Sequence, residues 1–124
     1  NDIPLTEAVP FMLAINAGAY SFEVANPRHY HEWRIWEDVK LPDGKILIPG
    51  LIGHATNYVE HPDLVADYIM KYAQLVGREN VIAGSDCGFS SRATYVPEVH
   101  PTVVWPKFRA LSDGAAQASK QLWG

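Results

Sequence analysis

Apolar positions along the chain switch repeatedly between the helical and the strand period. Residues 6–18 and 60–77 carry apolar side chains at helical spacing, and Pro62 and Gly77 suit the first turn and the C-cap of the second segment. Residues 102–123 form a further helical segment, in which we expect Pro106 in the first turn because proline breaks a helix interior. The side chains of this last segment that we expect to be buried are Val103, Val104, Phe108, Leu111, Ala115, Ala118 and Leu122.

Three segments between these helices read as strands. Residues 19–24 have β propensity and are expected to end near Glu23, whereas residues 46–52 and 80–85 are almost wholly apolar. Pro49 and Gly50 are expected to mark the end of the second strand. Residues 28–39 are expected to form a loop that leads into a short helix. Alternation of helices with continuous apolar strands predicts an α/β fold of right-handed βα units around a parallel sheet.

Composition narrows the class of protein. The 124 residues suffice for one domain or part of one, and 48% hydrophobic against 19% charged residues is typical of a chain that folds. A net charge of −4 argues against nucleic acid or an anionic membrane as the main partner. Its single cysteine, Cys87, forms no internal disulfide, which favours a reducing compartment and hence the cytoplasm. No apolar run is long enough to span a membrane, and the start at Asn1 suggests processing, trimming or a fragment.

Candidate chemistry lies where the strands end, because parallel α/β folds bind ligands at the carboxyl ends of their strands. The polar side chains that follow the three strands are Glu23, Asn26 and Arg28, then His54, Thr56 and Asn57, then Asp86 and Cys87. A cysteine between aspartate and glycine at a strand exit favours a functional role. His54 lies where a general acid would be useful, but a structural role explains it equally well.

The remaining histidines favour structural roles. His29 and His31 have the spacing of some metal sites, yet the neighbouring Trp33 and Trp36 favour an amphipathic surface or interface. His61 and His100 each precede a proline at the start of a predicted helix, and we expect them to be capping or turn residues. The glycine-rich phosphate motifs and the G-x-S-x-G elbow do not occur in the sequence. A nucleophilic pair of Cys87 and His54 remains open.

Four segments carry a resemblance to a known family. They are SFEVANPRH at residues 21–29, IPGLI at 48–52, TNYVEHP at 56–62 and VIAGSDCGF at 81–89. In this order they resemble the C-terminal catalytic domain of the cobalamin-independent methionine synthase family, and most of all its short, single-barrel branch, which includes epoxyalkane:coenzyme M transferase-like proteins. The match covers nearly the whole chain, and the Asp-Cys-Gly exit is its most specific element.

The resemblance implies a (β/α)8 barrel in which zinc holds a substrate thiol as the thiolate that attacks an alkyl donor. In the methionine synthases the thiol is homocysteine and the donor is a methyltetrahydrofolate. Carried over, Glu23 and Cys87 match zinc ligands, and His54 lies near a histidine proposed as general acid. Asn26, Arg28, Asn57 and Asp86 are then expected to bind substrate. Gly53 departs from the family pattern, because relatives commonly have aspartate there.

The resemblance also implies that this chain is a single partial domain, residues 1–124, with about three of the eight βα units of a barrel of about 250 residues. The family's His-x-Cys ligand pair would precede Asn1. We therefore expect weak zinc binding and no methionine synthase activity unless another chain completes the site. Two alternatives stay open. One is a non-catalytic half-barrel that self-associates through its open sheet edge and the Trp33/Trp36 surface. The other is a different enzyme, such as a hydrolase using Cys87 and His54 or a metal held by His29, His31 and His54.

Overall fold

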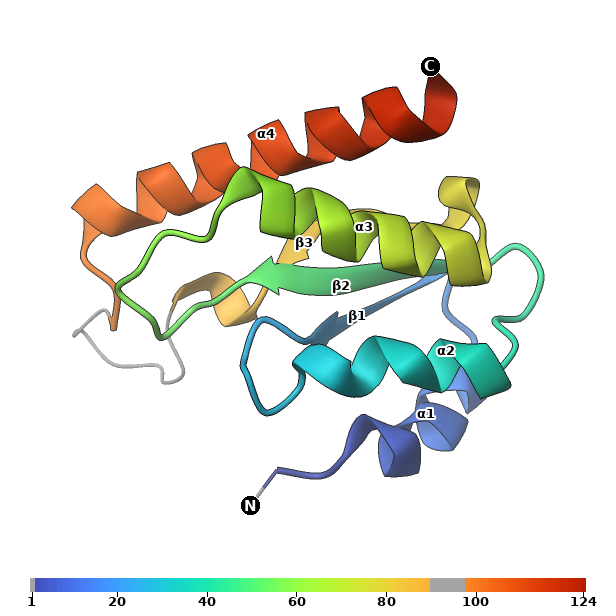
Figure 1. The fold of residues 1–124 in the computed structure, drawn as a ribbon. Helices are drawn as coiled ribbons and strands as arrows, with labels where there is room; N and C mark the ends of the chain where they lie inside the picture. Colours follow the sequence, from blue (N-terminus) through green and yellow to red (C-terminus); the bar gives the residue numbers. More distant parts are fainter. Residues whose placement is uncertain (1, 90–97) are drawn as a thin grey trace.

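The computed structural model describes residues 2–89 and 98–124 and shows a mixed α/β arrangement around a parallel sheet (Figure 1). Its strands, in the order β1-β2-β3, are β1 (Ala19–Glu23), β2 (Ile46–Ile52) and β3 (Gly84–Ser85). The helices are α1 (Leu5–Ala14), α2 (Ile35–Asp38), α3 (Pro62–Val76) and α4 (Pro101–Trp123). The predicted parallel α/β class is confirmed at this level. Three parallel strands with helices between them are consistent with part of a (β/α)8 barrel, and the described residues do not close one.

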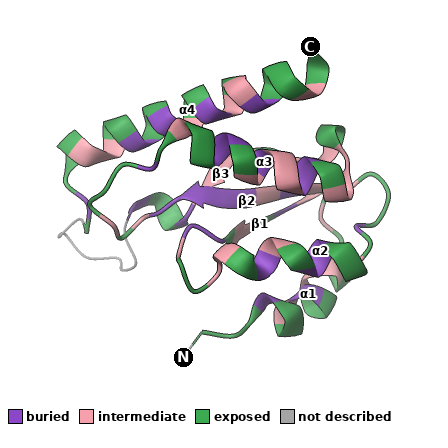
Figure 2. Cartoon of the chain, in the orientation of Figure 1, coloured by how far each residue is buried: buried purple, intermediate pink, exposed green. Residues whose placement is uncertain are grey.

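The helices cover one face of the sheet, and the central strand β2 is largely buried (Figure 2). Tyr20 is buried toward the helices, while Ser21 and Glu23 on the opposite face of β1 are exposed. Core side chains fall into two groups. One group joins α1, α2 and the start of the sheet, around Trp36 and Tyr72, and the second fills the space between β2, α3 and α4. Side chains that leave the sheet on its uncovered face therefore remain accessible to ligands.

Caps that the sequence predicts define the ends of the two long helices. His61 precedes α3, and its Nδ1 accepts a hydrogen bond of 3.2 Å from the backbone N–H of Asp63. His100 does the same for Thr102 at the start of α4, also at 3.2 Å. Gly77 ends α3 with a φ of 100°, a conformation that favours glycine. The predicted capping roles of both histidines are confirmed.

Strands β2 and β3 differ from the prediction. β2 continues through Pro49 and Gly50 to Ile52 instead of ending at them. The carbonyl of Leu47 accepts from Ile82 on the β3 side, so Pro49, two residues later, also points to that side. Between Gly50 and Ile52 the pairing with β3 is shifted, and the missing N–H of a proline is tolerated beside such an irregularity. β3 is correspondingly shorter than predicted, since only an isolated bridge precedes Gly84.

Helices α1 and α4 also correct the prediction. α1 ends at Ala14, four residues before Gly18. Pro106 lies in the interior of α4 rather than in its first turn, because Pro101 takes the first position. Part of the expected stripe is confirmed, because Ala118 is buried and Val104, Leu111, Ala115 and Leu122 pack half-buried against the second core group, whereas Phe108 is 39% exposed. The buried residues of α4 are Lys107, Ala110, Gly114 and Ala118.

Trp36 does not belong to an exposed aromatic surface. Its side chain is only 3% exposed and packs in the core against Phe22, with ring centroids 6.3 Å apart. The expectation of a Trp33/Trp36 interface is therefore wrong for Trp36, because α2 turns this side chain toward the sheet. None of the helices in the described part of the chain is long and apolar enough to cross a membrane. The polar loop predicted around Ser90 and Pro97 lies outside the described residues.

Candidate metal centre

Three side chains that the sequence places after separate strands meet at the carboxyl edge of the sheet. Glu23 ends β1, His54 follows β2 by two residues, and Cys87 follows β3 by two residues. One possible ligand atom from each, a carboxylate oxygen, an imidazole nitrogen and the sulfur, lies within 4.8 Å of the other two. Among the described residues, no other group of three or more such side chains is this close.

Two glycines leave room for this group on the uncovered face of the sheet. In the strand register Glu23 lies opposite Gly50, and Gly50 lies opposite Gly84. A side chain at Gly84 would meet Ile48, because an added Cβ would lie 2.8 Å from Ile48 Cγ2. The face beside Glu23 is thus free of side chains from the central strand, and the residues beyond the strand ends fold over it.

A left-handed turn directs Cys87 toward Glu23. Cys87, Gly88 and Phe89 have φ angles of 32°, 62° and 71°, a region that residues other than glycine rarely occupy. Such conformations cost free energy and cluster at functional sites. In this turn the Cys87 thiol donates a hydrogen bond to Glu23 Oε1.

The thiol of Cys87 is held in its protonated form by these neighbours. The hydrogen bond to Glu23, partial burial, and the negative charges of Glu23 and Asp86 raise the pKa of Cys87 to about 11. A thiol with this pKa is a poor nucleophile at neutral pH. A bound cation reverses this balance, because a metal ion stabilises the thiolate.

Asp86 lies behind the group rather than at its surface. Its side chain is 2% exposed, and Oδ1 accepts a hydrogen bond of 3.3 Å from the backbone N–H of Val24, the residue after Glu23. The carboxylate occupies the space above Gly50, where an added Cβ would lie 1.8 Å from Oδ1. Burial, followed by the nearby charge of Glu23, raises the pKa of Asp86 to about 7. Because Asp86 directly precedes Cys87, this hydrogen bond links the end of β1 to the turn that carries Cys87.

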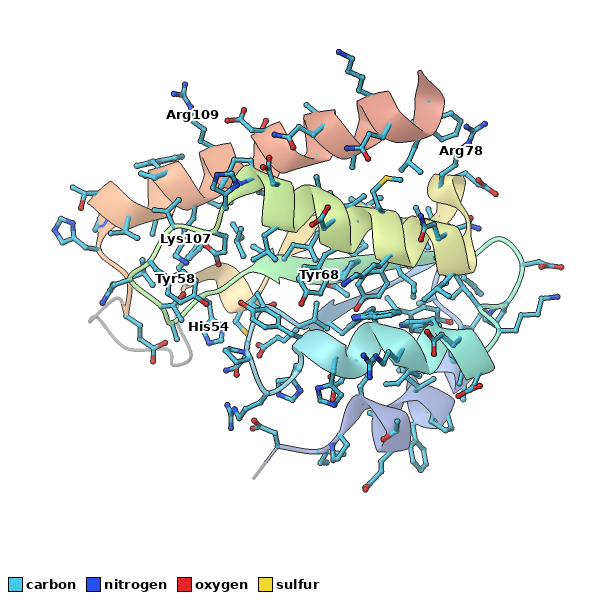
Figure 3. All side chains as sticks on the ribbon, viewed as in Figure 1. His54, Tyr58, Tyr68, Arg78, Lys107 and Arg109 are labelled. Carbon is cyan, nitrogen blue, oxygen red and sulfur yellow. The ribbon has the colours of Figure 1, made fainter. Side chains whose placement is uncertain are left out.

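A buried ion pair supports the loop that carries His54. Lys107 of α4 and Glu60 are 0% and 3% exposed, and Lys107 Nζ lies 2.9 Å from Glu60 Oε1. Figure 3 shows Lys107 pointing from α4 toward the loop with His54 and Tyr58. The sequence analysis missed this pair. A signal was available in the sequence, because Lys107 lies at helical spacing before Ala110, Gly114 and Ala118, the small buried residues of α4.

The other predicted site residues are not among the three side chains of this group. The Asn26 side chain accepts hydrogen bonds from the backbone N–H and Nε of Arg28, at 3.0 and 3.4 Å. Arg28 in turn lies 2.7 Å from Asp2. Asn57 is exposed. For these residues and Asp86, a role in substrate binding stays a prediction.

His29 and His31 do not belong to the metal group. His29 contacts Glu32, 3.0 Å from Nδ1, and Asp2, 3.4 Å from Nε2. Because His54 groups instead with Glu23 and Cys87, the alternative of a metal held by both of these histidines and His54 finds no support in the described residues.

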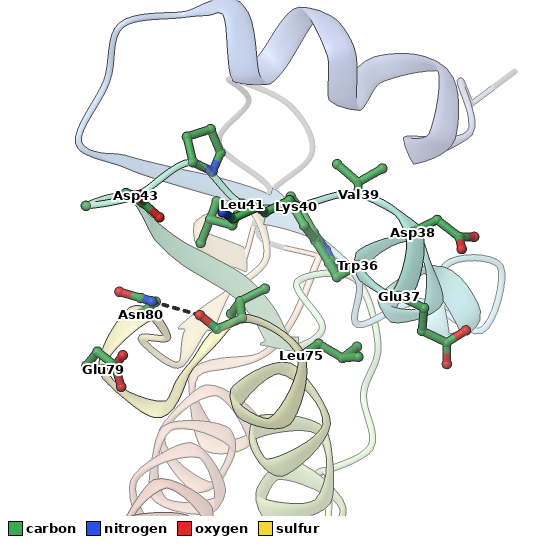
Figure 4. A pocket seen from close by; sticks show the side chains of 13 residues that line it. Trp36, Glu37, Asp38, Val39, Lys40, Leu41, Asp43, Leu75, Glu79 and Asn80 are labelled. Carbon is green, nitrogen blue, oxygen red and sulfur yellow. Dashed lines mark hydrogen bonds between the residues drawn. The ribbon is translucent and has the colours of Figure 1, made fainter.

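A cavity of about 560 Å³ lies at the other end of the sheet (Figure 4). Residues 36–44, which precede β2, line it together with Leu75, Val76, Glu79 and Asn80, which precede β3. One wall is fixed by Asn80, whose Nδ2 donates a 2.7 Å hydrogen bond to the carbonyl of Val76. Since the cavity lies at the amino end of the strands, it is separate from the Glu23–His54–Cys87 group.

The donor set fits zinc. Carboxylate oxygen, imidazole nitrogen and thiolate sulfur are the three ligand types that zinc takes from proteins, and catalytic zinc sites use three protein ligands with one position left for water or substrate. Tetrahedral coordination with bonds of about 2.0–2.3 Å separates neighbouring donors by about 3.3–3.8 Å. The separations of at most 4.8 Å therefore need only small side-chain adjustments.

Comparison with known proteins supports the fold. No protein-family model matches this chain, and no curated protein matches it significantly in sequence. Among solved structures, the chain is similar to a B12-independent methionine synthase from Shewanella sp. W3-18-1 in complex with selenomethionine, with a TM-score of 0.75 and 24% sequence identity. The superposition covers 95% of this chain and 31% of the synthase chain. This chain therefore has the fold of about a third of that protein.

Proposed function

We propose that this chain contributes a zinc site for alkyl transfer to a substrate thiol. The reaction that we favour is methyl transfer from a methyltetrahydrofolate-type donor to a thiol such as homocysteine. The observation that carries the proposal is the convergence of Glu23, His54 and Cys87 at the carboxyl ends of three parallel strands, with ligand atoms within 4.8 Å. The fold shared with part of a methionine synthase supports the reaction class. Because this chain spans 31% of that synthase chain, the activity of the complete enzyme is part of the proposal.

In this site Glu23 and Cys87 hold the metal, as the resemblance implies. His54 is the third donor, which departs from the general-acid role that the resemblance favours, because its ring nitrogen belongs to the same group. Zinc bound by these residues would lower the pKa of a substrate thiol and leave a position open for it.

The surrounding residues of the chain prepare the ligands. The Cys87 thiol donates to Glu23 Oε1, so the two ligands already face each other, and metal binding would release the thiol proton to solvent. Asp86 holds the backbone of Val24 and thereby the direction of Glu23. Arg28, with 68% of its side chain exposed, and the exposed Asn57 follow the ends of β1 and β2 in sequence and are proposed to contact the substrate. Since Cys87 must stay reduced, the proposed location is a reducing compartment such as the cytoplasm.

Zinc titration tests the metal site. Zinc is titrated against a chromophoric chelator with the wild-type chain and with Cys87→Ser, Glu23→Gln and His54→Ala. With His54 as a third donor, we expect stoichiometric binding in place of the weak binding expected for Glu23 and Cys87 alone. It should fall at least about 100-fold in each variant, because each removes one of three ligands. His31→Ala, an exposed histidine outside the group, is the matched control and should bind as the wild type does. Wild-type affinity in all three ligand variants would overturn the proposal.

His54 separates the two possible roles within that experiment. If His54 is a ligand, His54→Ala weakens zinc binding. If it acts as a general acid, His54→Ala binds zinc normally and only methyl transfer to the thiol is lost. If His54→Ala binds zinc normally and Cys87→Ser loses zinc affinity, the metal site is supported and His54 is a general acid instead of a ligand.

Self-association is a second candidate function. The supporting observation is that one face of the sheet is uncovered and that Ile82, just before the edge strand β3, is 50% exposed. Light scattering at several concentrations tests it, and a monomer at all of them would count against it. A cysteine hydrolase is less well supported, because the raised pKa of Cys87 opposes the thiolate that such an enzyme needs.

A further inference from the structure

The loop between β2 and α3 carries His54, and a buried charge pair fastens this loop from α4. Lys107 is fully buried although it lies on a helix 47 residues away from Glu60 in sequence. Its Nζ lies 2.9 Å from Glu60 Oε1 and 5.1 Å from the centre of the Tyr58 ring. A lysine is rarely buried this completely unless it is paired.

The pair holds the chain on both sides of His54. On one side, Glu60 Oε2 accepts a hydrogen bond of 2.5 Å from the backbone N–H of Gly53. On the other side, Lys107 Nζ donates a hydrogen bond of 3.1 Å to Thr56 Oγ1. The segment 53–56 is therefore anchored at its first and last residues by two partners that are themselves paired. His54 lies between the two anchors.

Hydrogen bonds to charged groups are shorter and stronger than those between neutral groups. Gly53 completes the arrangement, since an added Cβ there would lie 3.0 Å from Thr56 Oγ1 and 3.6 Å from Glu60 Oε2. Burying such a pair is not needed for stability alone, because apolar residues of similar volume often replace buried ion pairs without loss. A fixed backbone direction is what the charged pair supplies and an apolar pair does not.

We infer that Lys107 and Glu60 are positioning residues that orient the His54 side chain toward Glu23 and Cys87. The functional consequence rests on the proposed zinc site, whereas the orientation itself does not. α4 thereby takes part in the site without contributing a ligand, and loss of the pair should free the His54 ring without unfolding the sheet.

The test uses metal-free protein first. The ring 1H–13C NMR signal of His54 is assigned by its absence in His54→Asn. The key variant is Glu60→Gln/Lys107→Met, which removes both charges and keeps a side-chain oxygen for the Gly53 N–H. Arg109→Met is the matched control, because Arg109 is exposed on the same helix and points away from the loop (Figure 3). We expect a shifted or broadened His54 signal in the double variant and an unchanged signal in the control.

Zinc titration of the same proteins gives the second readout. Loss of residues that orient ligands weakens metal sites by about 10- to 100-fold, and we expect this range for the folded double variant and wild-type affinity for Arg109→Met. A folded double variant with an unchanged His54 signal and unchanged zinc affinity would overturn the inference. If the wild type binds no zinc, the proposed function fails, and the NMR comparison alone decides the inference.

A milder variant covers the case in which the double variant does not fold. Thr56→Val keeps the ion pair and removes only the anchor at one end of the segment. Thr56 is half-buried, so the fold tolerates this near-isosteric change. We expect a change of the His54 signal in the same direction but smaller, and an unchanged signal in folded Thr56→Val would overturn the inference.

Discussion

Gly50→Ala is expected to displace Asp86 and to loosen the metal centre from beneath. An alanine Cβ at this position would lie 1.8 Å from Asp86 Oδ1 and 2.9 Å from the Asp86 backbone nitrogen. Real Cβ atoms keep at least 3.0 Å from such neighbours, so Oδ1 would have to move by 3.0 − 1.8 = 1.2 Å or more. Both neighbours belong to the residue before Cys87, and one of them is backbone, which gives way less easily than a flexible side chain.

The magnitude follows from what this movement breaks. The hydrogen bond from Val24 N–H to Asp86 Oδ1 is already 3.3 Å long, and a further 1.2 Å would end it. A buried donor without a partner costs about 1–3 kcal/mol, and overpacking costs about 1–3 kcal/mol. Alanine in a strand regains about 0.5–1 kcal/mol relative to glycine. We therefore expect Gly50→Ala to lower the free energy of unfolding by about 1–5 kcal/mol.

Urea unfolding followed by circular dichroism measures this change. Gly18→Ala is the matched control, because nothing lies within 4 Å of a Cβ at Gly18 and its φ is not positive. The double variant Gly50→Ala/Asp86→Ala isolates the clash, since the added methyl then occupies the space that the carboxylate left. We expect a coupling free energy of about 1–3 kcal/mol in that cycle. If Gly50→Ala unfolds within about 0.5 kcal/mol of Gly18→Ala, or if the two changes are additive, the placement of Asp86 over Gly50 is refuted.

Three further changes test other parts of the structure. Gly114→Ala places a Cβ 2.6 Å from Val65 Cβ where α4 crosses α3, so we expect a loss of about 1–3 kcal/mol despite the better helix propensity of alanine; a raised melting temperature would contradict this. Burial and the charge of Glu23 raise the pKa of Asp86 to about 7, so the folded state binds its proton more tightly than the unfolded state. Stability of the metal-free protein should then fall as the pH rises from about 4 to about 7, by up to about 4 kcal/mol, and this dependence should be absent in Asp86→Asn, as urea titrations across that range will show. The buried hydroxyl of Tyr72 has no hydrogen-bond partner among residues 2–89 and 98–124, so Tyr72→Phe should leave the free energy of unfolding unchanged or raise it by about 1 kcal/mol, and a loss above that amount would reveal a missed partner.

Local sequence signals were sufficient for most of the fold. Residues 19–23 and 62–76 have the predicted type and nearly the predicted bounds, because each is bounded by residues with fixed backbone preferences. The helix caps at His61 and His100 follow from chemistry within two residues. Such features depend only on residues that are close together in the sequence, so they can be predicted from a single sequence.

Features that depend on partners distant in sequence were missed. Pro49 and Gly50 look like a strand end, but β1 pairs with β2 through Gly50 and keeps the backbone extended. The expected stripe of α4 included Phe108 and left out Gly114, because the close approach of α4 to Val65 of α3 is made at a glycine, which carries no apolar signal. Close packing of two helices selects small residues, and hydrophobicity alone does not indicate them.

The same distinction applies to the candidate site. Glu23, His54 and Cys87 could be predicted to converge, because the carboxyl ends of parallel strands always lie at one edge of a sheet. The residues that hold them could not be predicted in the same way. Asp86 depends on the absence of a side chain at Gly50, and Glu60 depends on a lysine from another helix.

The buried charges have a common location. Four charged residues are buried in the described part of the chain, and Glu32, Glu60 and Asp86 each follow the carboxyl end of one strand. The fourth, Lys107, reaches the same end from α4. Ion pairs and buried carboxylates contribute little net stability, so a requirement for stability would not gather them at one edge of the sheet. For three of them, a requirement for fixed side-chain directions would: Asp86 holds the backbone next to Glu23, and Glu60 with Lys107 holds the loop that carries His54. Glu32 instead accepts a hydrogen bond from the Leu5 N–H at the start of α1.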